Sequence, residues 1–105
     1  MMWITVARLD ELNEYHPFRA EADGEYFALF RDGNVVYCLR DACSHAEVPL
    51  SSGGYDRHGK VVTCVQHGAK FDIVTGKALT MPAASPVATY PVRILDGEVQ
   101  IQVEE

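Results

Sequence analysis

Residues 43–72 read CSHAEVPLSSGGYDRHGKVVTCVQHGAKFD, and this stretch decides how the chain is organised. It contains two short groups, Cys43-Ser44-His45 and Cys64-Val65-Gln66-His67, with eighteen residues between them. Each group offers one thiolate and one imidazole, which are common ligands of zinc and iron. Each group also leads into a small, polar or glycine-containing loop. We therefore expect two loops to hold one metal centre through Cys43, His45, Cys64 and His67.

The composition places the chain among small globular proteins. It has 105 residues, a hydrophobic content of 48% and a formal net charge of −6. We expect one domain over residues 1–105. The acidic surplus argues against a nucleic-acid partner, because phosphate binding needs a basic face. No apolar stretch approaches the roughly 18 residues that cross a membrane, and we see no basic leader. We expect a soluble, cytoplasmic protein whose cysteines stay reduced.

The segments on both sides of the ligand stretch favour β-structure. Residues 3–7, 25–30 and 34–39 are rich in β-branched and aromatic side chains, and Asp32-Gly33 predicts a hairpin turn. Residues 9–12 suit a single helical turn.

The C-terminal part repeats the hairpin pattern. Residues 89–95 and 98–103 flank Asp96-Gly97, and the last of these segments alternates polar and apolar side chains. We expect an all-β fold of antiparallel sheets, a sandwich or barrel. The metal-binding loops would be inserted at one end, within about residues 42–86.

The ligand set leaves two kinds of metal centre open. Two Cys and two His are common in tetrahedral structural zinc sites, but zinc fingers usually pair like ligands within one loop. Here each loop mixes one Cys with one His. That pairing suits a 2Fe-2S cluster in which both thiolates bind one iron and both imidazoles bind the other. Glycines near the loops would let the backbone turn tightly beside the metal. They are Gly53, Gly54, Gly68 and Gly76.

The pattern resembles the Rieske iron–sulfur domain, and the resemblance covers nearly the whole chain. Its core is Cys-x-His followed by Cys-x-x-His-Gly. Two positions depart from common relatives, which often have Gly after the first His and Pro after the second Cys. Those positions are Ala46 and Val65 here. Further similar segments are Leu50-Ser51-x-Gly53, Phe71-Asp72, Thr75-Gly76 and Pro82-Ala83-x-x-Pro86.

The resemblance also favours one type of Rieske protein. Subunits of respiratory bc complexes carry two extra cysteines that form a disulfide, at positions occupied here by Val48 and Gln66. They also place Ser and Tyr hydroxyls beside the cluster, where this chain has Ala69 and Phe71. Fewer hydrogen bonds to the sulfurs imply a potential near the lower end of the Rieske range, about −150 mV. The ferredoxin type is therefore implied.

Stand-alone Rieske ferredoxins carry single electrons, and the resemblance implies that role here. The implied partners are a flavin-dependent NAD(P)H reductase and the terminal component of an aromatic-ring-hydroxylating oxygenase. The protein is expected to be a monomer that docks transiently with each partner. We expect no catalytic residue in the chain itself. Two rivals remain: a small Rieske subunit of an assimilatory nitrite reductase, and a structural zinc-binding module.

Other notable residues have simpler interpretations. Cys38, inside a predicted strand, is expected in the core, and His16 and His58 are expected in solvated loops. Residues 81–86 would form a third loop covering the cluster, by resemblance. An acidic docking face is a further possibility, although solubility explains most of these side chains equally well and only Glu47 lies within a ligand loop. The candidate residues of this acidic face are Asp10, Glu11, Glu14, Glu21, Asp23, Glu25 and Glu47.

Overall fold

The computed structural model describes residues 1–44, 48–66, 68–81 and 85–104. Within these residues, ten β-strands form three antiparallel sheets, with two short 3-10 helices, η1 (Leu9–Glu11) and η2 (Leu50–Ser52). The predicted all-β fold is confirmed. The sheet orders are β1 (Met2–Arg8), β10 (Glu98–Val103), β9 (Val92–Leu95); β2 (Phe18–Ala22), β3 (Glu25–Asp32), β4 (Val35–Arg40), β8 (Thr89–Tyr90); and β5 (Gly54–Asp56), β6 (Val61–Thr63), β7 (Lys70–Asp72).

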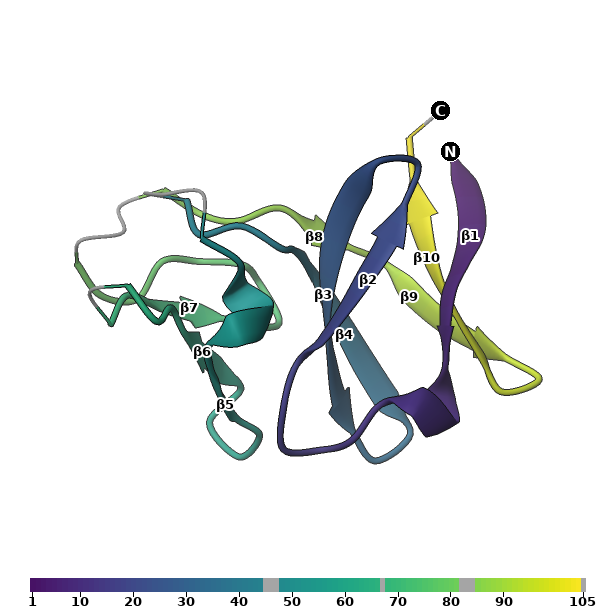
Figure 1. Cartoon of the computed structure of the whole chain (residues 1–105), viewed down its shortest axis with the longest axis horizontal. Helices are drawn as coiled ribbons and strands as arrows, with labels where there is room; N and C mark the ends of the chain where they lie inside the picture. The colour runs from purple at the N-terminus through teal and green to yellow at the C-terminus, as the bar shows by residue number, and fades with distance from the viewer. Residues whose placement is uncertain (45–47, 67, 82–84, 105) are drawn as a thin grey trace.

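The third sheet belongs to an insertion between β4 and β8, which we define as residues 41–88. The strands β1–β4 and β8–β10 form the scaffold. In Figure 1 the insertion lies at one end of the molecule, and both termini lie at the opposite end beside β1 and β10. The loops that carry the predicted ligands are therefore far from the termini, as expected for loops inserted at one end of a sandwich.

The central sheet is covered on both faces, which explains the apolar run in β3. Alternate residues of a strand face opposite sides. Phe27 and Leu29 accordingly pack into a core within the scaffold, whereas Ala28 and Phe30 pack into a second core shared with the insertion. All four side chains are buried. A strand buried on both faces reads as a continuous hydrophobic sequence.

Asp-Gly pairs lie at all three scaffold hairpins, but not in the same way. Asp23-Gly24 joins β2 to β3 and Asp96-Gly97 joins β9 to β10, and all these residues have positive φ, as in a type I′ turn. The prediction of a turn at Asp32-Gly33 is wrong by one residue. Asp32 pairs with Val35, so Gly33-Asn34 is the loop, and Gly33 has a φ of 62°. A glycine at the first loop position suits a type II′ turn.

The predicted strand over residues 89–95 is two strands in different sheets. β8 pairs with β4 in the central sheet, and β9 pairs with β10 in the outer sheet. Pro91 lies between them, and proline cannot donate a ladder hydrogen bond. After the insertion, the chain thus forms the two-residue edge strand β8 of the central sheet and then passes to the outer sheet.

Candidate metal centre

The structure brings the two predicted cysteine ligands into one core. Cys43 follows β4 and Cys64 follows β6, and their exposed fractions are 4% and 1%. Both belong to the core that the insertion shares with the central sheet, together with apolar side chains such as Leu50 and Phe71. His45 and His67 lie outside the described residues. Within the described part, Cys43 and Cys64 are therefore the site residues whose placement is known.

The two ligand loops close in the same way. The backbone N–H of Cys43 donates to the carbonyl oxygen of Val48 at 2.9 Å, and that of Cys64 donates to the carbonyl oxygen of Ala69 at 2.7 Å. In both loops the acceptor lies five residues after the cysteine. Each closure spans the position of the predicted histidine ligand, so the sequence similarity of the two groups has a counterpart in their backbone bonds.

Two of the four predicted glycines allow close backbone approach. A Cβ on Gly53 would lie 2.0 Å from the carbonyl oxygen of Thr63, the residue before Cys64. A Cβ on Gly76 would lie 2.1 Å from the carbonyl oxygen of Val87, and Gly76 also has a φ of 76°. Gly68 has a φ of 70° and open space around it, so glycine is favoured there by the backbone conformation and not by close packing. Gly54 lies in β5 with nothing near its Cβ position.

The surroundings of Cys64 are apolar. Ala69 and Phe71 are both fully buried in the same core, and neither side chain has a hydroxyl group. A cluster bound there would receive no hydrogen bond from these two side chains. Val48 is partly buried and packs against this core, whereas Gln66 is exposed. The side chains at the positions of the extra cysteines thus cannot form a disulfide.

Cys38 belongs to the other core, as predicted. Its exposed fraction is 2%, and it packs within the scaffold. Burial, helped by the negative charge of Asp41, raises the pKa of its thiol well above the usual range. A thiol so far from ionisation is a poor nucleophile and metal ligand. His16 and His58 are exposed, which confirms their expected place in solvated loops.

Asp41 is a polar residue of the site region that the sequence analysis missed. It lies two residues before Cys43, and it is the buried charged residue of the described chain, with an exposed fraction of 5%. Its carboxylate accepts hydrogen bonds from the backbone N–H and the hydroxyl of Ser51 and pairs with Arg19. An isolated acidic residue after a strand gives little sequence signal of such a role.

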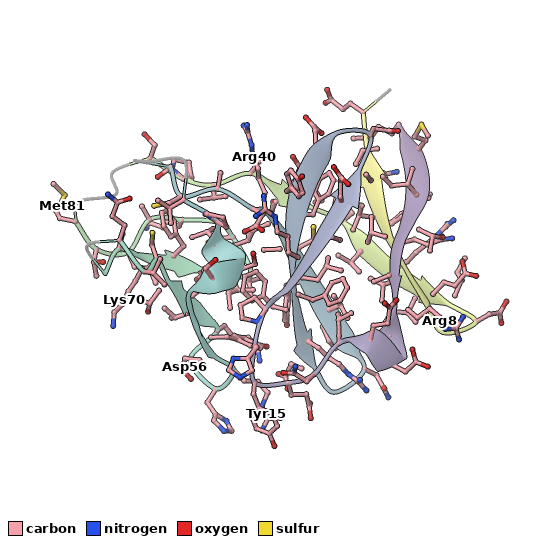
Figure 2. The ribbon with its side chains drawn as sticks, in the orientation of Figure 1. Arg8, Tyr15, Arg40, Asp56, Lys70 and Met81 are labelled. Atoms are coloured by element: carbon pink, nitrogen blue, oxygen red, sulfur yellow. The ribbon has the colours of Figure 1, made fainter. Side chains whose placement is uncertain are left out.

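The third predicted loop is described only at its ends. Met81 is 78% exposed, and Figure 2 shows it at the tip of the insertion. Residues 82–84 lie outside the described residues, as does Glu47 of the possible acidic face. The other members of that acidic set lie in the N-terminal part of the scaffold, from η1 to the β2–β3 hairpin.

The donor chemistry fits an iron–sulfur cluster. Two soft thiol groups, the candidate ligands Cys43 and Cys64, lie in one apolar core, which is suited to a sulfide-containing centre. Residues 2–91 match the Rieske [2Fe-2S] domain family. The chain belongs to that family. Its cofactor is a Rieske-type 2Fe-2S cluster, and the family match argues against the structural zinc module.

Similar proteins are ferredoxins of dioxygenase systems. The anthranilate 1,2-dioxygenase ferredoxin subunit of Burkholderia cepacia is 37% identical over 96% of this Rieske chain and 92% of its own length. The solved ferredoxin of carbazole 1,9a-dioxygenase from Nocardioides aromaticivorans IC177 superposes with a TM-score of 0.93 at 31% identity, covering 99% of this chain and 100% of that one.

Two further solved structures bear on partners and rivals. A chain in the complex of reduced oxygenase and oxidized ferredoxin in carbazole 1,9a-dioxygenase has a TM-score of 0.85 at 28% identity, covering 97% of both chains. A putative NADH-dependent nitrite reductase small subunit from Mycobacterium tuberculosis has a TM-score of 0.83 at 25% identity, covering 99% of this chain and 97% of that one. A nitrite reductase subunit is therefore a weaker interpretation of this chain than a dioxygenase ferredoxin.

Among the described residues no cluster of three or more His, Cys, Asp or Glu side chains could hold a metal ion. The four-ligand set needs His45 and His67 in addition.

No helix in the described ranges is long and apolar enough to span a membrane.

Proposed function

We propose that this Rieske domain is the ferredoxin of an aromatic-ring-hydroxylating oxygenase system, and that it binds its cluster through Cys43, His45, Cys64 and His67. The observation that carries the proposal is the burial of Cys43 and Cys64 in one core, behind two loops with matching closures. The similar dioxygenase ferredoxins span nearly the same length as this chain.

The proposed role is outer-sphere transfer of single electrons. When bound, the cluster supplies reversible storage of one electron with no bond made or broken. The thiolates of Cys43 and Cys64 offset part of the iron charge, and neutral imidazoles leave the oxidised centre uncharged. A carrier of this kind takes electrons from a flavin-dependent NAD(P)H reductase and passes them to the terminal oxygenase. The complex of a related ferredoxin with its oxygenase supports the second partner.

The proposed potential is low for a Rieske protein, about −150 mV. The support comes from two residues that share a core with Cys64. Ala69 and Phe71 have apolar side chains at positions where hydroxyl groups would raise the potential. Redox titration followed by visible circular dichroism measures it. Phe71→Tyr should move the midpoint upward if the new hydroxyl reaches a sulfur. A wild-type value above about +100 mV, well up the known range, would contradict this part of the proposal.

Docking is proposed at the tip of the insertion. Leu79 and Met81 are exposed apolar side chains there, and the N–H of Leu79 donates to the carbonyl oxygen of Lys70 at 2.8 Å. Val65, in the second ligand loop, is also exposed. Figure 2 shows Lys70 and Met81 at this end. Met81→Glu should slow electron transfer to the oxygenase without changing the potential. Leu95→Glu, an exposed position on the scaffold, is the matched control and should leave the rate unchanged.

Reconstitution tests the carrier role. The purified protein should be brown, give a rhombic EPR signal after reduction, and restore NAD(P)H-dependent turnover when mixed with a reductase and a ring-hydroxylating oxygenase. His67→Ala should lose both the signal and the turnover. Stable co-purification with a large sirohaem protein would favour the nitrite reductase subunit instead. A colourless protein with one zinc would favour the structural module.

The remaining parts of the proposal concern organisation. We place the whole of residues 1–105 in one Rieske domain, with the cluster loops within about 42–86. A monomer in the cytoplasm suits a diffusing carrier that must leave each partner quickly. Sedimentation equilibrium of the holoprotein would test the monomer, and a stable dimer would overturn it.

A further inference from the structure

Asp41 stands at one end of the first ligand loop and Ser51 stands at the other. The Asp41 carboxylate accepts the backbone N–H of Ser51 at 2.7 Å and the Ser51 hydroxyl at 2.5 Å. Its side chain is fully buried. Hydrogen bonds to a buried carboxylate are among the stronger ones in proteins, and a buried charge without such partners would be costly.

The bonds of Asp41 enclose those of Cys43. The Cys43 N–H to Val48 carbonyl bond lies inside the segment that Asp41 and Ser51 join. Asp41 itself is fixed to the central sheet, because its N–H donates to the carbonyl oxygen of Tyr26 at 3.0 Å. The loop is therefore closed twice, and the outer closure is a side chain that a substitution can remove.

Arg19 supplies the opposite charge from β2. Its Nε lies 3.3 Å from the Asp41 carboxylate, and its guanidinium lies over the Tyr26 ring at 3.8 Å from the centroid. The Arg19 side chain is 42% exposed, so solvent weakens this ion pair. The bonds to Ser51 are the better shielded part of the arrangement. Figure 2 shows Arg40, the residue before Asp41, near the boundary between scaffold and insertion.

We propose that Asp41 is a positioning residue for the metal centre. Its carboxylate joins both ends of the first ligand loop and ties them to the scaffold, and it thereby holds Cys43 in place for the cluster. This inference rests on the proposed role of Cys43 as a ligand. Residues behind metal ligands commonly change metal affinity about 10- to 100-fold when they are replaced.

Four variants of the holoprotein separate positioning from charge and from general stability. Asp41→Ala removes every bond of the carboxylate. Asp41→Asn removes the charge but keeps a carbonyl oxygen that can accept the Ser51 N–H. Ser51→Ala removes only the hydroxyl bond. Asp72→Ala is the matched control, since Asp72 also accepts two backbone N–H groups, from Val74 and Thr75, in a turn outside the two ligand loops.

The measurements are cluster release in excess chelator, followed by loss of visible absorbance, the EPR g-values of the reduced protein, and the midpoint potential. We expect Asp41→Ala to release its cluster about tenfold faster or more and to shift both g-values and potential. Asp41→Asn should shift the potential upward through the lost charge and keep nearly normal g-values. Ser51→Ala should release the cluster slightly faster, and Asp72→Ala should lower the melting temperature with wild-type g-values and potential.

Equal g-values and release rates in Asp41→Ala and Asp41→Asn would overturn the proposal, because only charge would then matter. Asp41→Ala behaving like Asp72→Ala would also overturn it. Should Asp41→Ala fail to fold, Ser51→Ala decides, and a wild-type release rate in that variant would count against the proposal. A wild-type protein without iron and sulfide in the same series would refute the proposed function itself, which is a separate result.

Discussion

The scaffold and the insertion are built by different means. Scaffold strands run up to eight residues and pair in long ladders, whereas β5, β6 and β7 have three residues each. The scaffold core consists of ordinary apolar side chains and Cys38. The insertion's core includes both candidate ligand thiols. We therefore expect the insertion to depend more than the scaffold on a cluster bound by Cys43 and Cys64.

Charge follows the same division. The insertion carries equal numbers of acidic and basic side chains, so the formal net charge of −6 lies on the scaffold. The acidic docking face suggested by the sequence stays a prediction, and all its candidates except Glu47 lie on the scaffold. The charged residues of the insertion are Asp41, Glu47, Asp56, Asp72, Arg57, Lys60, Lys70 and Lys77.

Removing the cluster should give the largest effect, and it should unfold the insertion while the scaffold stays folded. Chelation, or Cys64→Ser, should abolish amide-exchange protection in β5–β7, because three-residue strands cannot sustain a sheet without the metal-linked core. Protection in β1, β3 and β10 should largely persist. Hydrogen exchange read by mass spectrometry checks this. Equal loss of protection in both halves would show that they fold as one unit.

Gly76→Ala should give the next largest effect. The new Cβ would meet the Val87 carbonyl, and the residue would keep a left-handed φ, which together predict about 2–5 kcal/mol of lost stability. Gly24→Ala is the matched control, because its φ of 78° is similar and its surroundings are open. It should cost about 1–2 kcal/mol. Denaturant unfolding of both holoproteins measures the difference, and equal costs would contradict the close-packed turn.

Ile101→Ala should destabilise the scaffold without touching the redox centre. Ile101 is fully buried in the scaffold core, and its truncation predicts a loss of about 2–5 kcal/mol. Leu95→Ala, at a position that is 48% exposed in the same sheet, should lose much less. The midpoint potential should stay at the wild-type value in both. A shifted potential in Ile101→Ala would mean that the two cores are coupled more tightly than their separate packing indicates.

The smallest predicted effect concerns a contact between the two halves. Lys60 of the insertion hydrogen-bonds Asp32 of β3, and this bond holds the pKa of Asp32 below its usual value and that of Lys60 above it. The lowered Asp32 pKa contributes stability above about pH 4. That contribution disappears as the pH falls through the folded-state pKa.

The raised Lys60 pKa has the opposite sign. Its contribution is complete below about pH 10 and disappears as the pH rises through the folded-state pKa. Asp32→Asn should therefore lower stability modestly at neutral pH and converge with wild type in acid. Thermal melts at several pH values test this. A difference that stays constant down to about pH 2, well below the usual Asp pKa, would show that the ion pair is not its cause.

Much of this organisation follows from local patterns in the sequence. Asp96-Gly97 marks its hairpin because both residues suit positive φ, and Val99 and Ile101 reveal a half-buried strand by alternation. The candidate ligand cysteines stand out because each lies close in sequence to a histidine. The fold class, the loop positions and Cys38 as a core residue were all predictable on that basis.

Other features depend on tertiary contacts that local patterns do not reveal. β2 has the sequence FRAEA, with few β-forming residues, and it forms because it pairs with β3. The break at Pro91 depends on which sheet each half joins. Asp41 gains its role from Ser51, ten residues away, and from Arg19 on another strand. A pattern of residue types does not predict such pairings.

The central claim is that two mixed loops hold one cluster through two thiolates and two imidazoles. The most direct test is iron and acid-labile sulfide analysis, combined with pulsed EPR for nitrogen coupling on the reduced holoprotein. We predict two irons and two sulfides per chain, strong coupling to two imidazole nitrogens in the wild type, and loss of the EPR signal in His45→Ala and His67→Ala. Absence of sulfide, or of nitrogen coupling in a protein that holds iron, would contradict it.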